Sequence, residues 1–358
     1  MQQLIERLVR PEIRELSAYH VPDATGLIKL DAMENPYPWP EELRRRWLDA
    51  LYDVQHNRYP DPQGTELQTA LREAMGIPAN MDLLLGNGSD ELIQMLALTV
   101  ARPGRKILSL DPGFVMYRLI GLLAGMEYVG VPLRAEDFAL DLPAVLQAME
   151  QEQPAITFLA YPNNPTGNLF DTEALERILE AAPGLVVIDE AYAPFTDRSF
   201  LSRLGGWPNL LVLRTVSKMG LAGLRLGYLA GPEAWLAQID KARLPYNVNV
   251  LTQVSAAFAL RYKDVLDDQT RRIREERSRL HLALSSLEGL RVYPSEANFI
   301  LLRLPHGRAG DIFESLKAGG VLVKNLDGAH ALLRDCLRVT VGAPQENDAF
   351  LAALASAL

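Results

Sequence analysis

The chain has very little cysteine and no long apolar run, and both shortages exclude classes of protein. Its one cysteine, Cys336, cannot form a disulfide within the chain, and a reducing compartment is therefore expected. The uncharged run "LIGLLAGM" at 119–126 is far shorter than the roughly 20 residues that a membrane-spanning helix needs. The first twenty residues are charged throughout and lack the apolar core of a secretory signal. A cytoplasmic protein without membrane contact is expected.

The sequence also lacks an excess of positive charge. Its formal net charge is −9, whereas binding nucleic acid requires a basic face that neutralises phosphates, so nucleic acid is not an expected partner. Two arginine clusters, at 44–46 and 271–279, are accompanied by glutamates and are interpreted as solvated helix faces. A chain of 358 residues with 48% hydrophobic and 23% charged residues favours two globular domains over one.

Short β-rich runs alternate with helical patterns between about residues 65 and 245. One of the helical patterns is "DTEALERILEAA" at 171–182. This alternation predicts an α/β fold with parallel strands, whose ligands gather at the carboxyl ends of the strands. The candidate strands are "DLLLGN", "KILSL", "YVGVPL", "AITFLA", "LVVIDEAY" and "NLLVLRT".

The pattern changes after the turn "RLPYNVN" at 243–249. A long charged helical pattern at 257–287 leads into the candidate strands "NFILLRL", "GVLVKN" and "CLRVTVG", with a helix between the first two and a closing helix at 346–358. We interpret this part as a smaller α+β domain joined by the N-terminal arm. The expected division is an arm at 1–50, a large domain at 51–245 and a small domain at 246–358.

The stretch "LLLGNGSDELIQMLA" at 83–97 reads as a strand, a glycine turn and a helix. Gly88 and Ser89 at the helix start leave backbone amides free to hold an anion. The stretch is neither a Walker loop nor a dinucleotide fingerprint. The alternative is structural: Ser89 caps the helix, with Asp90 and Glu91 favoured by the helix dipole.

Three further strand ends carry one polar group each. In "AYPNNPTGN", Asn164 could donate to a ligand oxygen, or it could serve only the turn. Asp189 ends the apolar strand of "LVVIDEAYAPF", where a carboxylate must be paired, and capping the next helix is the alternative. Lys218 follows a buried strand in "TVSKMGLAGLRLGY". An amine that forms a Schiff base, an aspartate for a pyridinium proton and a helix start for a phosphate are what pyridoxal 5'-phosphate requires.

These stretches resemble a known family, the fold-type I pyridoxal-phosphate-dependent aminotransferases, and within it the histidinol-phosphate aminotransferases. The resemblance covers essentially the whole chain. It implies a three-layer large domain with a mainly parallel sheet, a small domain built from both termini, and a homodimer with active sites at the interface. The motifs that carry it are "YPNNPTG", "VVIDEAY", "SKMGLAGLRLGY", "LRVTVGAPQEND", "LSAYHVP", "LDAMENPY", "RYPDPQGTELQTAL", "GNGSDELI" and "DPGFVMY".

The resemblance also implies roles around the cofactor. Lys218 would bond covalently to it and move the substrate proton, and Asp189 would pair with its ring nitrogen. Tyr192 and Asn164 would hydrogen-bond the ring oxygen, and Phe114 would stack on the ring or, alternatively, only pack in the core. The residues implied for the phosphate are Gly88, Ser89, Asp90, Ser217 and Arg225, with Tyr59 reaching it from the partner subunit.

For the substrate, the resemblance implies contacts with Arg338, Lys324, Asn35 and Tyr19. Arginine suits either a carboxylate or a phosphate, because its planar fork matches both. Lys324 could instead be an exposed lysine at a strand end. Met33 stands where the family frequently has asparagine. No metal site is predicted, and the five histidines are interpreted as structural or surface residues: His20, His56, His281, His306 and His330.

The implied reaction is transamination of L-histidinol phosphate with 2-oxoglutarate in histidine biosynthesis. Two other enzymes stay open at this point, a threonine-phosphate decarboxylase and an aromatic amino-acid aminotransferase, because both share these motifs. A noncatalytic protein that only binds pyridoxal 5'-phosphate is a more distant alternative. It would need neither the electron-accepting ring partner Asp189 nor the proton-carrying Lys218.

Overall fold

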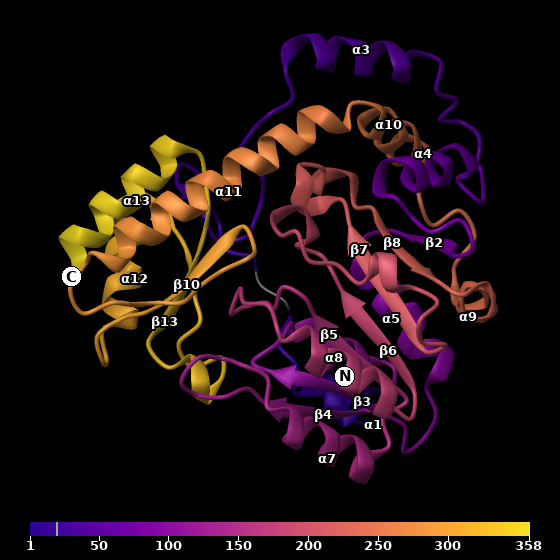
Figure 1. Ribbon diagram of the computed structural model, residues 1–358, viewed down its shortest axis with the longest axis horizontal. Helices are drawn as coiled ribbons and strands as arrows, with labels where there is room; N and C mark the ends of the chain where they lie inside the picture. The colour runs from indigo at the N-terminus through magenta and orange to yellow at the C-terminus, as the bar shows by residue number, and fades with distance from the viewer. Residues whose placement is uncertain (19–20) are drawn as a thin grey trace.

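The computed structural model describes residues 1–18 and 21–358. Its centre is a seven-stranded sheet in the order β2-β8-β7-β6-β5-β3-β4 (Figure 1). Strand β8 runs antiparallel to both of its neighbours, and the remaining pairs are parallel. The strands are β2 (Asp82–Gly86), β3 (Lys106–Asp111), β4 (Glu127–Pro132), β5 (Ile156–Ala160), β6 (Leu185–Asp189), β7 (Leu210–Thr215) and β8 (Gly227–Gly231).

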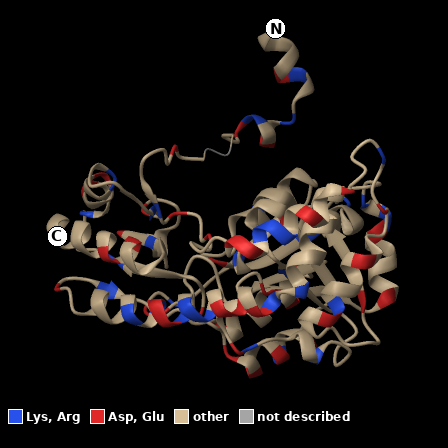
Figure 2. Ribbon diagram, turned by 90° about the horizontal axis from the view of Figure 1, so that it is seen from above, with Lys and Arg blue, Asp and Glu red and all other residues tan. Residues whose placement is uncertain are grey.

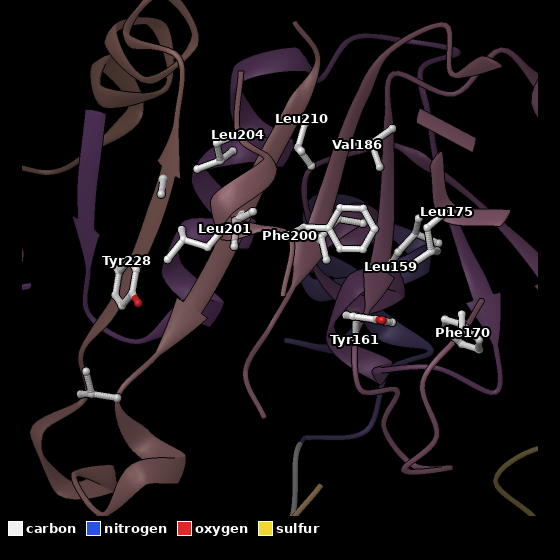
Figure 3. Packing of buried hydrophobic residues seen from close by; sticks show 14 of the residues in the cluster. Leu159, Tyr161, Phe170, Leu175, Val186, Phe200, Leu201, Leu204, Leu210 and Tyr228 are labelled. Atoms are coloured by element: carbon white, nitrogen blue, oxygen red, sulfur yellow. The ribbon is translucent and has the colours of Figure 1, made fainter. Parts of the chain in front are cut away.

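The central strands are apolar on both faces because helices cover both sides of the sheet. In β6, Val186 and Ile188 belong to one hydrophobic cluster while Leu185 and Val187 belong to another, as the two-residue period of a strand requires. Figure 3 shows part of the first cluster, with Val186, Leu159 and Leu210 beside Phe200. The helices of the first cluster include α4 (Thr65–Met75), α7 (Leu142–Glu152) and α8 (Thr172–Ala181); those of the second include α5 (Ser89–Val100), α6 (Val115–Leu123) and α9 (Glu233–Ile239).

Local capping explains where several helices begin. Asp141 accepts a hydrogen bond from the Ala144 amide at 3.2 Å at the start of α7, and Asp171 accepts one from Glu173 at the start of α8. The helix expected at 171–182 is therefore found within one residue of its predicted bounds.

A second, smaller group of strands is built from distant parts of the chain. Its antiparallel sheet has the order β12-β13-β10-β9, and the N-terminal strand β1 (Ile28–Lys29) pairs in parallel with β11 (Val321–Leu322). The sheet strands are β9 (Arg291–Val292), β10 (Phe299–Arg303), β12 (Lys324–Asn325) and β13 (Cys336–Thr340), with helices α11 (Lys263–Ser285), α12 (Ala309–Ala318) and α13 (Pro344–Ala357) packed on them.

The α/β fold with a mainly parallel sheet is confirmed, with differences in detail. The expected strand "GVLVKN" is two short strands, β11 and β12, which belong to different sheets. Strand β8 was not predicted, since its sequence "GYLAG" and the glycines before it read as a turn. The single helical pattern at 257–287 is two helices, α10 (Val250–Arg261) and α11, separated at Tyr262. Helix α10 is buried against α4 and α3 (Glu41–Tyr52), whereas α11 crosses to the smaller sheet (Figure 1).

The N-terminal helices α1 (Gln2–Leu8) and α2 (Pro11–Arg14) bury none of their residues, and α1 stands away from the body of the molecule in Figure 2. Arg10, between the two helices, donates to the Leu123 carbonyl at 2.8 Å. Lysines and arginines are interspersed with acidic residues over the rest of the surface. Within the cluster at 271–279, Arg271 is solvated as predicted, but Arg277 is buried and donates to the carbonyls of Phe195 and Ala297. Among the described helices, none is both long and apolar enough to cross a bilayer.

Candidate active site

A cavity of about 390 Å³ lies at the carboxyl edge of the central sheet. The turns that follow β2, β3, β5, β6 and β7 all open toward it, because parallel strands end at the same edge. The N-terminal segment closes one side through Ala32, Met33 and Glu34. Nine of the residues predicted from the sequence line this cavity: Ser89, Asp90, Phe114, Asn164, Asp189, Tyr192, Ser217, Lys218 and Arg225.

Lys218 extends from the turn after β7 into this cavity. Its Nζ lies 3.3 Å from the carbonyl oxygen of Ala32 and 5.9 Å from the ring centre of Tyr192. Burial, and after it the positive charge of Arg338, lower the pKa of Lys218 to about 8. A lysine with this pKa has a substantial neutral fraction near physiological pH, as a nucleophilic amine requires.

Asp189 ends strand β6 and is buried, with its side chain facing the cavity. Its Oδ2 accepts a hydrogen bond from the Tyr117 hydroxyl at 2.6 Å, and its Oδ1 accepts one from the Ala191 amide at 3.0 Å. Burial raises the pKa of Asp189 to about 6, against the lowering effect of these two hydrogen bonds. In the described part of the chain Asp189 has no salt bridge, so a cationic group in the cavity would complete its environment.

Tyr117 is a functional residue that sequence reasoning missed. It lies in the quoted motif "DPGFVMY", but no role was assigned to it. Its ring stacks on Phe158 at 4.7 Å, and its edge meets Phe114 at 5.4 Å, so the hydroxyl is held in place at Asp189. The need to pair a buried carboxylate was the only available signal, because 72 residues separate the two partners.

A chain of hydrogen bonds connects the two sheets across the cavity. Arg338 of β13 donates from Nη1 to Asn164 Oδ1 at 2.6 Å, and Asn164 Nδ2 donates to the Tyr192 hydroxyl at 3.1 Å. Tyr192 donates in turn to the Met33 sulfur at 3.3 Å. Burial is the main cause that raises the pKa of Tyr192, so its hydroxyl stays protonated and available as a donor.

The start of helix α5 forms a cradle for an anion. Gly88 has a φ of +86°, and a Cβ atom at this position would lie 2.8 Å from Nη2 of Arg225. Gly227 of β8 permits a similar approach to the Ser89 amide, where a Cβ would lie at 2.6 Å. The two glycines thus bring a guanidinium and the first helix amides together, as binding of a phosphate requires. Arg225 Nη2 also lies 3.6 Å from Asp90.

Five predicted residues of the described chain are not in the cavity lining, and one of them is Gly88, directly before Ser89. Asn35 donates to the Met219 carbonyl and to Gln269, so its amide fastens the N-terminal segment to neighbouring elements. Arg338 reaches the site through Asn164, and Lys324 lies directly opposite Arg338 in the pairing of β12 with β13. Tyr59 is 80% exposed and stacks on Tyr246, outside the cavity of its own chain. Tyr19 and His20 lie outside the described residues.

Another cavity of the described chain lacks a candidate nucleophilic amine. It measures about 470 Å³, lies beside Tyr246 and includes the glycine-bounded start of α4 at Gly64, but no lysine lines it. No described histidine lines the 390 Å³ cavity. In residues 1–18 and 21–358, no group of three or more histidine, cysteine, aspartate or glutamate side chains could hold a metal ion.

The residues of the 390 Å³ cavity fit the cofactor expected from the sequence. Lys218 supplies an amine of lowered pKa, Asp189 a buried carboxylate without a cationic partner in the described chain, and Gly88 a cradle that a side chain would fill. These three features lie around one cavity and match a carbonyl, a protonated ring nitrogen and a phosphate.

Comparison with known proteins gives agreement along the whole chain. The family described as aminotransferase class I and II matches residues 25–354. A Nitrosococcus oceani protein named histidinol-phosphate aminotransferase 2 is 57% identical over 98% of this chain and 97% of its own length. Histidinol-phosphate aminotransferase of Chromobacterium violaceum is 53% identical over 99% of both chains. The crystal structure of histidinol-phosphate aminotransferase from Sinorhizobium meliloti, in complex with pyridoxal-5'-phosphate, superposes with a TM-score of 0.87 at 27% identity, covering 98% of this chain and 97% of that one.

Proposed function

The chain belongs to the class I and II aminotransferases, and from this membership we propose that it transfers the amino group of L-histidinol phosphate to 2-oxoglutarate. It is an aminotransferase, and its cofactor is pyridoxal 5'-phosphate. The observation that carries the proposal is the cavity shared by Lys218, Asp189 and the cradle at Gly88. The names of relatives that are 53% to 57% identical support the choice of amino donor, and 2-oxoglutarate as the acceptor is our addition.

Several residues that line the cavity have distinct roles in this reaction. When bound, pyridoxal 5'-phosphate supplies a carbonyl that amines attack and a ring that accepts electrons from the substrate carbon. Lys218 would supply the neutral amine that bonds to that carbonyl, and its amine would carry a proton to and from the substrate. Asp189 keeps the ring nitrogen protonated, while the α5 start with Ser89, Ser217 and Arg225 holds the phosphate.

The remaining polar groups orient the cofactor and the substrate. Tyr192 and Asn164 direct hydrogen-bond donors toward the ring oxygen, and Phe114 packs along the ring. Arg338 is buried and donates to the side-chain oxygen of Asn164 and to the Asp31 carbonyl, which places a guanidinium, suited to a carboxylate or a phosphate, next to a residue that lines the cavity. Lys324 shares its sheet face, since residues directly opposite in paired strands point the same way.

The test is a half-reaction followed by absorption spectroscopy. Addition of L-histidinol phosphate alone to the cofactor-loaded protein is expected to convert the band of the lysine-bound cofactor into that of the aminated cofactor. Subsequent 2-oxoglutarate should restore the first band. The Lys218→Ala variant is the matched control, in which neither conversion should occur at a comparable rate.

The result also separates the other candidates. Carbon dioxide released from threonine phosphate, with no response to 2-oxoglutarate, would replace the proposal by a decarboxylase. Conversion by aromatic amino acids but not by L-histidinol phosphate would replace it by an aromatic aminotransferase. A band that responds to no amine would leave a protein that only binds the cofactor.

We further propose that the enzyme is a cytoplasmic homodimer in which Tyr59 completes the partner's site. An exposed tyrosine stacked at 4.4 Å on Tyr246 and lying outside its own cavity supports this arrangement. The single buried cysteine, Cys336, is consistent with a reducing compartment.

A further inference from the structure

A second cavity, here called the rear cavity, lies next to the 390 Å³ cavity, which is called the cofactor cavity from here on. The rear cavity measures about 220 Å³, and its lining includes Glu190, Ser199 and Arg214. Thr215, the last residue of β7, lines both cavities. Successive residues of a strand point to opposite faces, which explains why Asp189 faces the cofactor cavity and Glu190 the rear one.

The rear cavity contains a buried ion pair with all of its acceptors in use. Glu190 Oε2 accepts from Arg214 Nε at 2.9 Å, from Arg214 Nη2 at 2.7 Å and from Ser199 at 2.9 Å. Glu190 Oε1 accepts from the Phe200 amide at 2.5 Å. The Glu190 side chain is 0% exposed and the Arg214 side chain is 14% exposed. Such a pair adds little net stability, because the cost of burying both charges cancels most of their attraction. A role other than stability is therefore worth seeking.

The position of the ion pair, at the ends of β6 and β7, indicates what that role is. Backbone pairing of β6 with β7 ends at Asp189 and Leu213, and the Glu190 amide makes the last bond, to the Leu213 carbonyl at 2.8 Å. Beyond this point β6 gives way to the turn that carries Tyr192, while β7 continues to Thr215, paired with β8, before the turn that carries Lys218. The Glu190 to Arg214 contact is thus the side-chain continuation of the ladder, placed where the ladder itself stops.

Within the pair, Arg214 also offsets the negative charge of Glu190, which is next to Asp189 in the chain. Burial is the main reason that the pKa of Asp189 is raised, and the negative charge of Glu190 adds to this effect. Arg214, in bidentate contact with Glu190, offsets that charge directly behind the ring-binding carboxylate.

We propose that Glu190 and Arg214 are positioning residues: their ion pair fixes the spacing of the ends of β6 and β7, and so sets Asp189 and Lys218 on one bound cofactor. Neither residue touches the cofactor cavity. The inference rests on the proposed function, since it requires that pyridoxal 5'-phosphate binds between these two residues.

The experiment separates positioning from stability with a single and a double variant. Arg214→Met leaves Glu190 as an unpaired buried charge, whereas Glu190→Gln with Arg214→Met removes both charges and keeps similar shapes. For each we would measure thermal unfolding without cofactor, the dissociation constant for pyridoxal 5'-phosphate, and the visible circular dichroism per bound cofactor. The last quantity reports how firmly the cofactor is oriented.

The expected result is that the double variant regains most of the unfolding temperature lost in Arg214→Met. It should still bind the cofactor about ten-fold more weakly than the wild type, with reduced circular dichroism. The matched control is Lys106→Met, which breaks the ion pair with Glu152 at the amino end of β3; neither residue lines either cavity. It should leave affinity and circular dichroism unchanged.

A double variant with wild-type affinity and wild-type circular dichroism would overturn the proposal, because the pair would then serve stability alone. If Arg214→Met does not fold, the cofactor affinity and the circular dichroism of the double variant still test the proposal. A wild-type protein that takes up no pyridoxal 5'-phosphate would overturn the proposed function first, and the positioning role with it.

Discussion

At the scale of single residues, Asp189 works against the stability of the cofactor-free protein. Its folded-state pKa of about 6 lies above the ordinary value of 3.8, so the folded protein holds this proton more tightly than the unfolded chain. The stability contributed by the protonated form is fully present below pH 3.8 and is lost as the pH rises through 6. Above that pH the carboxylate is charged, buried and in need of a cation.

Asp189→Asn is therefore expected to stabilise the protein without cofactor and to weaken cofactor binding. At pH 8 the gain should be about 1 to 3 kcal/mol in the free energy of unfolding, and it should be smaller at pH 5. Denaturant unfolding at both pH values measures the gain, and titration with pyridoxal 5'-phosphate measures the binding loss of at least about ten-fold. An equal gain at the two pH values would show that the charge of Asp189 is not its cause.

A pH dependence of the opposite kind is expected for Lys218. Burial lowers its pKa to about 8, so the neutral amine increases as the pH rises through that value. The rate at which cofactor-free protein bonds to pyridoxal 5'-phosphate should rise with pH, with a midpoint near 8. Stopped-flow absorbance measures this rate. Free Nα-acetyl-lysine is the control, and a shared midpoint for the two would mean that the cavity does not lower the pKa.

The residues that sequence reasoning identified at the site follow apolar strands in the chain. Asp189 and Lys218 could be predicted because a charge after a buried strand signals a function, and both line the same cavity. Tyr117 could not be assigned, because its contact with Asp189 depends on how α6 lies over β6. The contacts of Asn35 likewise depend on the packing of η3 (Ser217–Met219) and α11, which local patterns do not specify.

At the scale of elements, the turn from β2 into α5 is the most demanding backbone of the site. Gly88→Ala would place a side chain 2.8 Å from Arg225 at a φ of +86°, where non-glycine residues are strained. We expect about ten-fold weaker binding of pyridoxal 5'-phosphate, whereas binding of pyridoxal, which lacks the phosphate, should change little.

The control for this prediction is Gly76→Ala at the end of α4. Gly76 also has a positive φ, +65°, but a Cβ there meets nothing within 4 Å. Both variants should lower the unfolding temperature. Only Gly88→Ala should weaken the binding of pyridoxal 5'-phosphate more than that of pyridoxal. Equal weakening of both ligands in Gly88→Ala would contradict an anion cradle at this turn.

Elements were predicted best where apolar runs are long and bounded by turns. The six strands expected in the central sheet are all present, but β8 was not predicted because three of the glycines near it read as turn residues. In β8, Gly227 is required by the close approach of the Ser89 amide, so a glycine that suggests a loop serves packing instead. The separation of α10 from α11 was equally hidden, since both continue one helical pattern.

At the scale of the whole molecule, the domain bounds at 50 and 245 stay a prediction. The smaller sheet and the strand pair β1 with β11 support a unit built from both ends of the chain. Helix α10 follows residue 245 and so falls within the predicted small domain. It nevertheless packs on α4 and α3, which precede the strands of the large sheet in the chain.

The dimer can be tested by mixing two inactive variants. Lys218→Ala retains Tyr59, and Tyr59→Ala retains Lys218, so a hybrid dimer would contain one site with both residues if Tyr59 acts in the partner subunit. Random mixing should recover about a quarter of wild-type activity, because half of the dimers are hybrids with one intact site each. The measurement is activity after unfolding and refolding the mixture together. No recovery, with dimers confirmed by sedimentation, would place Tyr59 outside the partner's site.

The pairing of β1 with β11 has a consequence for synthesis on the ribosome. The two strands are about 290 positions apart in the chain, and at roughly 5 to 20 residues per second the second is made some 15 to 60 s after the first. The N-terminal segment that carries Ala32 and Met33 must wait for that interval before it can be fixed over the cavity. The central sheet is complete in the emerging polypeptide well before this, so the enzyme acquires its closed active site only in the last moments of translation.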